Sequence, residues 1–386
     1  MELVLASNFD DALVDGSRDL PVSTFFGNFP VTLTGGGRPP RILPAVSPER
    51  FRSHLAAVHA TGREFYATLN SNDLGLREYT PEFRAAFRAE VDELLDLGVD
   101  GFVVALPLLV ELIRADHPEV PISVSTFARI RTATQADYYL DLGADTIVLE
   151  EANRDFPLLK ALVRRGARVE VLVNQSCLQG CPFRGHHLNT SSLAAQPGNP
   201  CPEFEYPIAE CGREMLRDPS RLVSSILVRP EDLSVYEAAG VSRFKVSGRN
   251  HATPWLLRAA RAYAGRSYPG DLLDIVSFVQ VRGPLGYLTR RAAEHPDDAV
   301  AVAWRDAYAR LAHVSIDNRR FPAGFLATIA KIDCEHRTCA ECGFCARVAR
   351  DVLRIDGRPL ADYAPPDLGR PLADLLPGGP MQPVPP

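Results

Sequence analysis

A helix followed by a glycine and a short strand recurs between residues 60 and 250, and this repeat constrains the fold more than any other feature. Clear copies occupy residues 95–104, 140–149, 164–173 and 237–246. In the helix before the first copy, Thr80 and Pro81 suit the start, and Gly98 suits a left-handed cap at the end. One amphipathic helix for each strand is the pattern of a parallel sheet covered by helices.

Counting such strands favours a particular closed architecture. Short apolar or β-branched runs predict strands at Glu2 to Ala6, Val22 to Phe26, Glu64 to Leu69, Gly101 to Ala105, Pro121 to Thr126, Thr146 to Glu150, Val169 to Val173 and Phe244 to Ser247. Eight strands alternating with helices favour an α/β fold of the (β/α)8, TIM-barrel-like kind. A doubly wound open sheet is the alternative, but Gly35, Gly36 and Gly37 do not follow a strand directly, as its phosphate turn would. We interpret this triplet as a flexible loop.

The pattern changes after residue 250, where we expect helices at Pro296 to Ala312 and Ala346 to Ile355. We therefore divide the chain into a barrel domain at 1–265 that includes the first cysteine group, a helical, cysteine-rich C-terminal extension at 266–363, and a tail at 364–386. The tail is dense in proline and glycine, a composition that cannot build a core, so we expect it to be disordered.

The net charge and the short apolar runs argue against a membrane protein and against a nucleic-acid-binding protein. The start of the chain lacks a basic segment followed by a long apolar one, and no apolar run is long enough to span a bilayer, so we expect a cytoplasmic protein without a membrane span. The net charge is −6 and no run of lysine or arginine is present, which argues against nucleic acid as a partner. We expect a small-molecule or peptide substrate instead.

All eight cysteines fall into two groups of four. The first group is Cys177, Cys181, Cys201 and Cys211, and it begins four residues after the seventh predicted strand. Active sites of such barrels lie at the carboxyl ends of the strands, which is where this group belongs. Its spacing is not that of a zinc finger or ribbon, whereas thiolates from a long loop can wrap an iron-sulfur cluster. Zinc, or no metal, remains the alternative.

The second group is Cys334, Cys339, Cys342 and Cys345. Three cysteines at three-residue steps resemble the compact runs that bind iron-sulfur clusters, so we expect a second [4Fe-4S] cluster here, with a structural zinc as the alternative.

Cationic side chains near the ends of the seventh and eighth predicted strands are candidates for an active site. Arg184 lies in the first cysteine loop, and Lys245 and Arg249 lie in and after the eighth strand. Guanidinium and ammonium groups at this face can hold a carboxylate or phosphate, and we predict catalytic roles for all three. The plain alternative is that they form ion pairs with nearby glutamates. The C-x3-C spacing at Cys177 also invites a radical-SAM interpretation, but Arg184 stands where the third cysteine of that motif belongs, which argues against it.

Several motifs between Glu64 and Tyr268 resemble the U32 peptidase-like family. They are Thr68-Leu69-Asn70 after an early strand, the strand Ser123 to Thr126, the cysteine loop after Leu172-Val173-Asn174, and the block from Arg229 to Arg249, which is the most specific match. The resemblance implies a TIM-barrel-like domain with a [4Fe-4S] cluster held by Cys177, Cys181, Cys201 and Cys211, and a role for Lys245 and Arg249 at the active face. It also implies oxygen-independent hydroxylation, which members perform on tRNA or rRNA bases or on ubiquinone precursors, with prephenate implicated as the oxygen donor. The shorter cysteine spacing, Glu150-Glu151 at the sixth strand end, and the second cysteine group depart from the family pattern.

Three functional hypotheses follow. The first is an iron-sulfur oxidoreductase that hydroxylates a small metabolite or peptide, with the C-terminal group relaying electrons from a donor or stabilising the extension. The second is a U32-type peptidase or hydrolase, although the sequence offers no GxSxG and no HExxH motif. The third is a non-catalytic, cluster-bearing subunit that completes the site of a paralogous partner.

Overall fold

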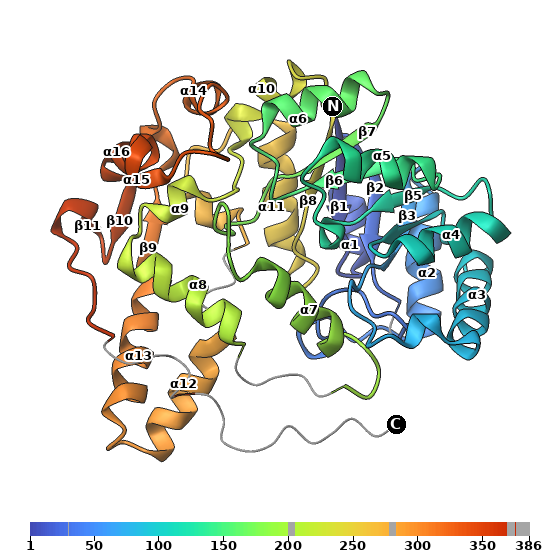
Figure 1. Ribbon diagram of the computed structural model, residues 1–386, viewed down its shortest axis with the longest axis horizontal. Helices are drawn as coiled ribbons and strands as arrows, with labels where there is room; N and C mark the ends of the chain where they lie inside the picture. Colours follow the sequence, from blue (N-terminus) through green and yellow to red (C-terminus); the bar gives the residue numbers. More distant parts are fainter. Residues whose placement is uncertain (30, 200–204, 278–282, 369–374, 376–386) are drawn as a thin grey trace. The chain divides into compact units, whose positions relative to one another are not determined.

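Eight parallel strands close into a barrel in the computed structural model, which describes residues 1–29, 31–199, 205–277, 283–368 and 375 (Figure 1). The strands are β1 (Glu2–Ala6), β2 (Val22–Gly27), β3 (Glu64–Leu69), β4 (Gly101–Val104), β5 (Ile122–Val124), β6 (Thr146–Leu149), β7 (Arg168–Leu172) and β8 (Arg243–Val246). Each strand pairs with the next, and β8 closes the ring on β1, where Lys245 stands opposite Val4. The predicted TIM-barrel-like fold is confirmed.

Helices follow the strands as the repeat predicts. They are α1 (Asp11–Gly16), α2 (Pro48–His59), α3 (Pro81–Asp96), α4 (Pro107–Asp116), α5 (Ala133–Asp141), α6 (Phe156–Arg164), α10 (Leu233–Glu237) and α11 (Thr253–Ala264). The start of α3 is as expected, because the Thr80 side chain accepts a hydrogen bond from the Phe83 N–H at 3.2 Å. Gly98 ends this helix with φ +100°, a conformation that glycine adopts without steric cost. Among the described residues, no helix is both long and apolar enough to cross a membrane.

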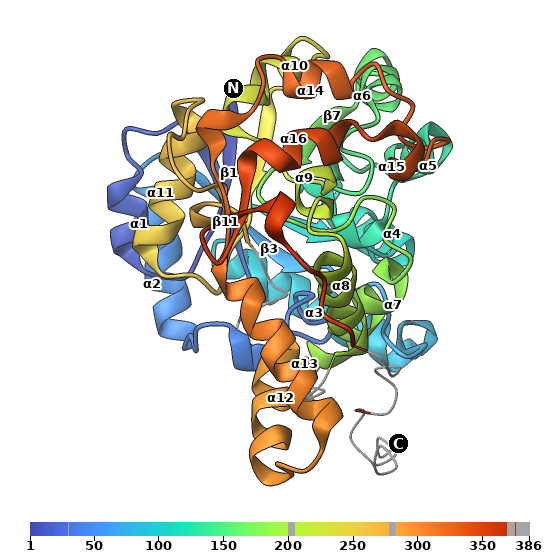
Figure 2. The ribbon, with the colours of Figure 1, turned by 90° about the vertical axis from the view of Figure 1, so that its left-hand side faces the viewer.

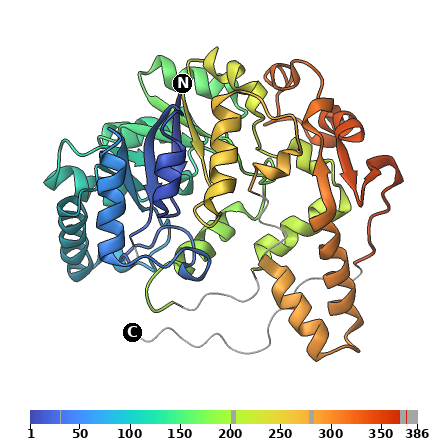
Figure 3. The ribbon, with the colours of Figure 1, turned by 180° about the vertical axis from the view of Figure 1, so that it is seen from behind.

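Apolar helix faces and strand side chains form the core of the barrel unit. Helix α3 buries Phe83, Phe87, Val91 and Leu94, which recur at helical spacing along one face. Figure 3 shows the blue helices α1 and α2 and the yellow helix α11 standing beside the strands on this side of the barrel. Burial of these apolar faces makes the largest favourable contribution to the free energy of folding of the barrel.

Contacts between Cα atoms divide the chain into two compact units. The first comprises Met1–Asn174, Leu188–Cys201 and Val228–Ser267, and the second comprises Gln175–His187, Pro202–Leu227 and Tyr268–Pro386. The segments that carry Cys177, Cys181 and Cys211 therefore group with the C-terminal region, whereas we expected the first cysteine group inside the barrel domain. Cys201 and most of the predicted tail at 364–386 lie outside the described residues.

The second unit combines short helices with a small sheet. Its helices are α8 (Tyr206–Arg217), α9 (Arg221–Ser224), α12 (Gly283–Glu294), α13 (Ala299–Ala309), α14 (Phe325–Ile329), α15 (Cys339–Cys342) and α16 (Phe344–Val352), and α7 (Arg184–Ala194) spans the division between the units. Helices α12 and α13 pack side by side (Figure 2). Strands β9 (Val314–Ile316), β10 (Leu353–Ile355) and β11 (Arg358–Pro359) form an antiparallel sheet in the order β11-β10-β9. The helix expected to run to Ile355 therefore ends at Val352, because residues 353–355 pair with β9 instead.

Candidate functional site

A cavity of about 370 Å³ lies at the carboxyl end of the barrel strands. Its walls include Ser7 after β1, Asn28 after β2 and Arg249 after β8, which are three neighbouring strands of the ring. Because the strands are parallel, these residues meet at the same end of the barrel, the end that carries the active site in folds of this type. The volume is that of a site for a small molecule.

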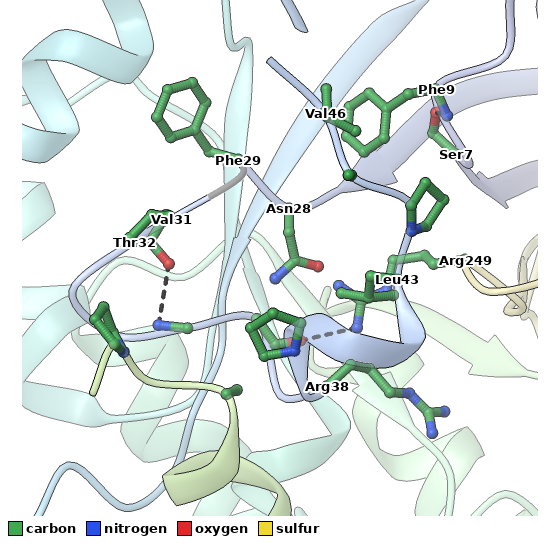
Figure 4. Close-up of a pocket in the computed structure, with 17 residues that line it drawn as sticks. Ser7, Phe9, Asn28, Phe29, Val31, Thr32, Arg38, Leu43, Val46 and Arg249 are labelled. Atoms are coloured by element: carbon green, nitrogen blue, oxygen red, sulfur yellow. Dashed lines mark hydrogen bonds between the residues drawn. The ribbon is translucent and has the colours of Figure 1, made fainter. Parts of the chain in front are cut away.

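Two guanidinium groups line this cavity, those of Arg38 and Arg249 (Figure 4). Arg249 donates to the Thr68 hydroxyl at 2.9 Å and to the Gly36 carbonyl at 2.8 Å, so its head group is fixed in place. Burial, together with the positive charge of Arg38, lowers the pKa of Arg249 to about 9. The group is still protonated at neutral pH, and an anion bound beside it would raise this pKa again, because an opposite charge favours the charged form of the guanidinium. The predicted place of Arg249 at the barrel mouth therefore suits anion binding.

The glycine triplet builds one wall of the cavity. Gly35 and Gly36 line it, and Gly35 has φ +68°. A Cβ on Gly36 would lie 1.3 Å from the side-chain nitrogen of Asn28, so this amide packs directly on the Gly36 backbone. The side-chain oxygen of Asn28, Oδ1, is buried and has no hydrogen-bond partner among the described residues. Two residues of the triplet, Gly35 and Gly36, are thus part of the site, where the sequence alone indicated only a flexible loop.

A chain of hydrogen bonds runs from the cavity into helix α2. The Ser7 hydroxyl lies 2.8 Å from Nε2 of His54, and Nδ1 of His54 lies 2.8 Å from the Asp11 carboxylate. Arg50 donates to the same carboxylate at 2.8 Å. The sequence did not reveal these residues, because His54 is 47 positions from Ser7 and 43 positions from Asp11, and the three match no local motif.

Lys245 lies in a buried ion pair rather than in the cavity wall. Its Nζ is 2.8 Å from Glu170, which also accepts from Arg243 at 2.8 Å, and it stands 4.1 Å from the centre of the Phe26 ring. Burial alone would raise the pKa of Glu170, but the two cations hold it below its ordinary value. The plain alternative for this lysine, an ion pair with a glutamate, therefore describes its environment.

A second, small cavity is lined by three of the four cysteines in the first group. Cys177, Cys181 and Cys211 line it together with Arg184, whose guanidinium donates to the Cys177 sulfur at 3.6 Å. Helix α8 carries both Cys211 and Ala209. The Tyr308 hydroxyl of α13 donates a hydrogen bond to the Ala209 carbonyl. The structure thus brings Arg184 and three predicted ligands together, while Cys201 is outside the described residues.

The second cysteine group lies around a tight turn between two helices. Cys339 and Cys342 begin and end α15, Cys345 lies in the first turn of α16, and Gly343 connects them with φ +65°. Thr338 and Glu341 cap α15 reciprocally. Cys339 is exposed, and Cys334, Cys342 and Cys345 are half-buried.

The donor set of the small, cysteine-lined cavity fits an iron-sulfur cluster. Thiolates are the usual ligands of such clusters, and a guanidinium beside a sulfur stabilises its negative charge. Among the described residues, no three histidine, cysteine or acidic side chains are gathered around one point as ligands of a single ion.

Comparison with known proteins places these features in a family. The profile of "Peptidase family U32" matches residues 41–265. The uncharacterized protease MJ1657 of Methanocaldococcus jannaschii is 24% identical over 293 residues, or 75% of this chain and 77% of that protein. A tRNA hydroxylation protein P of Helicobacter pylori is 25% identical over 240 residues, which is 56% of this chain and 53%, about half, of that protein. A solved structure, the U32 peptidase Mk0906, is 22% identical with a TM-score of 0.48, covering 64% of this chain and 92% of that one.

The profile covers more than half of the chain, including the strands whose carboxyl ends carry Thr68 and Arg249. The resemblance seen in the sequence motifs is therefore confirmed. This chain belongs to peptidase family U32.

Proposed function

We propose that this protein is an iron-sulfur-dependent oxidoreductase of the U32 type, which hydroxylates a small metabolite or peptide without molecular oxygen. The observation that carries the proposal is the cavity lined by Cys177, Cys181 and Cys211 with Arg184 against the first of these sulfurs. A relative that is named for tRNA hydroxylation supports the reaction type.

Cys177, Cys181 and Cys211, with Cys201 as the fourth ligand, would hold a [4Fe-4S] cluster. Such a cluster supplies one-electron chemistry when bound. Arg184 tunes this site, because a donor to a ligand sulfur and a nearby positive charge both favour the reduced, more negative form. Packing of α8 against α13 holds Cys211 in place, since a Cβ on Gly212 would meet the Tyr308 ring at 2.6 Å.

Arg249, with Arg38, would hold the anionic group of a substrate or oxygen donor in the barrel cavity. A charge-assisted hydrogen bond from a buried guanidinium is among the stronger polar contacts that a site can make. Prephenate, a dicarboxylate, is the donor that the family resemblance suggests. Lys245 neutralises Glu170 inside the barrel and does not line the ligand cavity.

The second cysteine group would hold another [4Fe-4S] cluster, or a structural zinc. Exposure of Cys339 suits electron exchange with a donor protein or with a paralogous partner subunit. These roles are proposed on the spacing of the cysteines and on the turn that gathers three of them.

Two variants test the two halves of this proposal. Arg184→Gln removes the charge beside Cys177, so the cluster should still form and its reduction potential, measured by EPR-monitored titration, should become more negative. Arg249→Gln should raise the dissociation constant for prephenate by about 10-fold or more, as expected for the loss of a charge-assisted hydrogen bond worth about 1.5–3 kcal/mol. Unchanged potential in the first variant, or no binding of prephenate to the wild-type protein, would count against the corresponding role.

A further inference from the structure

The hydrogen-bond chain of Ser7, His54 and Asp11 has the order of atoms found in nucleophilic serine sites. The hydroxyl meets Nε2 of the imidazole, and the carboxylate meets Nδ1, both at 2.8 Å. Ser7 and His54 are 1% and 0% exposed, yet Ser7 borders the barrel cavity. In such triads the carboxylate fixes the tautomer of the histidine, and the histidine takes the hydroxyl proton.

The surroundings of His54 keep it able to accept a proton. Burial lowers its pKa below the ordinary value of 6.5, Asp11 and Asp10 oppose that shift, and Arg50 adds to it. Burial alone would raise the pKa of Asp11, but hydrogen bonds from His54 and Arg50 hold it below its usual value, so its ionised carboxylate accepts a hydrogen bond from the Nδ1–H of His54. The lone pair on Nε2 then faces the Ser7 hydroxyl. The Phe9 ring, 5.3 Å away, and the Phe65 ring, 6.1 Å away, enclose the imidazole.

A strained turn fixes the position of Ser7. The Phe9 N–H donates to the Ser7 hydroxyl oxygen at 3.0 Å, and Phe9 itself has φ +61°, which is uncommon for a residue with a side chain. The Ser7 N–H donates to the Phe26 carbonyl at 2.9 Å, which continues the barrel ladder. Strain at such a turn persists only where the surrounding structure enforces it, and it is frequent at functional sites.

The remaining walls of the cavity indicate what would bind beside this hydroxyl. Figure 4 shows Ser7 beside Phe9, Arg249 near them, and the Asn28 amide near the middle of the view; Arg38 also lines the cavity. Most of the other walls are apolar, from residues such as Phe29, Leu43 and Val46. The cavity therefore suits a small molecule with an apolar body and an anionic group.

We propose that Ser7 is a nucleophile in a second activity of this protein, the hydrolysis of a small ester or amide that carries a carboxylate or phosphate group. The Ser7 oxygen attacks the carbonyl carbon while His54 Nε2 takes the hydroxyl proton, and that proton passes to the leaving alcohol or amine as the acyl bond breaks. Water then attacks the acyl-serine, His54 takes a proton from the water, and this proton returns to Ser7 as the acid is released. The Asn28 amide and Arg249 line the same cavity as Ser7 and are donors that can stabilise the oxyanion. This activity needs no iron.

The alternative is that the same bonds only tie the turn after β1 to helix α2. Reaction with a fluorophosphonate separates the two possibilities, because only an activated serine displaces the fluoride. We expect one adduct per full-length wild-type chain, mapped to Ser7 by peptide mass spectrometry. The same yield is expected from the iron-free protein, so failure of the iron chemistry would not affect this result.

Variants assign the reactivity to the three residues. Ser7→Ala should abolish labelling, His54→Gln should slow it by about 100-fold or more, and the wild-type rate should rise with pH as His54 loses its proton and then level off. Ser125→Ala is the matched control, since this buried hydroxyl also follows a strand, β5, but bonds to the Asn70 amide, and its variant should label normally. A folded wild-type protein that stays unlabelled, an adduct on another serine, or a rate indifferent to pH and to His54 would overturn the proposal.

The substrate class is tested with two p-nitrophenyl esters, the neutral acetate and the monoester of glutarate, which carries a carboxylate. The wild-type protein should prefer the glutarate ester in kcat/KM, and Arg249→Gln should lower that preference at least 10-fold. A monophosphorylated ester of similar size shows whether phosphate serves equally well. Equal kcat/KM values for neutral and anionic esters in the wild-type protein would overturn the assignment of an anionic substrate.

Discussion

Glu90 in helix α3 connects protein stability with the wall of the barrel cavity. Its carboxylate accepts the Leu33 N–H at 2.8 Å, in the loop that also carries Gly35 and Gly36, and burial raises its pKa from 4.5 to about 7. A carboxyl group with a raised pKa in the folded state binds its proton more tightly there than in the unfolded state. Between pH 4.5 and about 7 the stability of the fold therefore falls as pH rises.

We expect Glu90→Gln to remove this dependence. One pKa unit corresponds to about 1.4 kcal/mol, so the ionised group costs at most about 3.5 kcal/mol at pH 8. The variant should unfold at a higher temperature than the wild type at pH 8 and at nearly the same temperature at pH 5. Glu111→Gln, an exposed carboxylate in helix α4, is the control and should change neither value by much. An equal shift at both pH values would contradict the assignment.

The ion pair of Lys245 with Glu170 predicts a loss of stability when the lysine is replaced. Lys245→Met leaves Glu170, which is 1% exposed, with Arg243 as its remaining cation, and we expect a loss of about 2–4 kcal/mol in the free energy of unfolding, measured with urea. The double variant with Glu170→Gln should recover more than half of that loss. A Lys245→Met protein of normal stability that no longer binds prephenate would instead restore a role for this lysine at the ligand.

Some residues of the site could be predicted from the sequence and others could not. Arg249 could be placed at the barrel mouth because it closely follows a strand, and strand ends meet at one face. The partners of Lys245 and the Ser7–His54–Asp11 chain could not be found, because they depend on which side chains from distant strands and helices face each other. No local pattern records that information.

At the scale of the elements, the loop after β2 tests how the cavity is built. In Gly36→Ala the new Cβ would collide with the Asn28 amide, which can rotate away. We expect a modest loss of stability, about 1 kcal/mol, together with weaker prephenate binding in calorimetry, because the displaced amide alters the cavity wall.

Gly286→Ala is the matched control for that change. Gly286 lies exposed in helix α12 with open space at its Cβ position, so alanine should raise the free energy of unfolding by about 0.5–1 kcal/mol. Prephenate binding should stay unchanged in this variant. If Gly36→Ala binds as tightly as the wild type, the loop does not shape the ligand site.

Strands β4, β6, β7 and β8 were predictable because a glycine after the preceding helix marks where each of them begins. Gly98, Gly143, Gly166 and Gly240 all adopt positive φ at these points. The C-terminal region was less predictable: residues 353–355 continue an apolar helical pattern but pair with β9. Sheet pairing with a distant strand there outweighs local helical preference.

At the scale of the whole molecule, charge bears on the choice of substrate. The net charge of −6 and the lack of a lysine or arginine run predict weak binding of RNA, although a relative is named for tRNA hydroxylation. We expect a dissociation constant for tRNA of roughly 10 µM or weaker at physiological salt in a filter-binding assay. Submicromolar binding that weakens steeply with salt would contradict a small-metabolite or peptide substrate.

The proposed iron-sulfur clusters are tested most directly by the iron, sulfide and zinc content of the full chain. This content is measured after anaerobic purification and compared between the wild type and Cys177→Ser. The account predicts about eight iron and eight sulfide per wild-type chain, or about four of each with one zinc if the second cysteine group is structural. In Cys177→Ser about four iron should be lost, along with the corresponding EPR signal after reduction. A wild-type chain that binds only zinc, or no metal at all, would contradict the iron-sulfur assignment and leave hydrolysis at Ser7 as the activity to pursue.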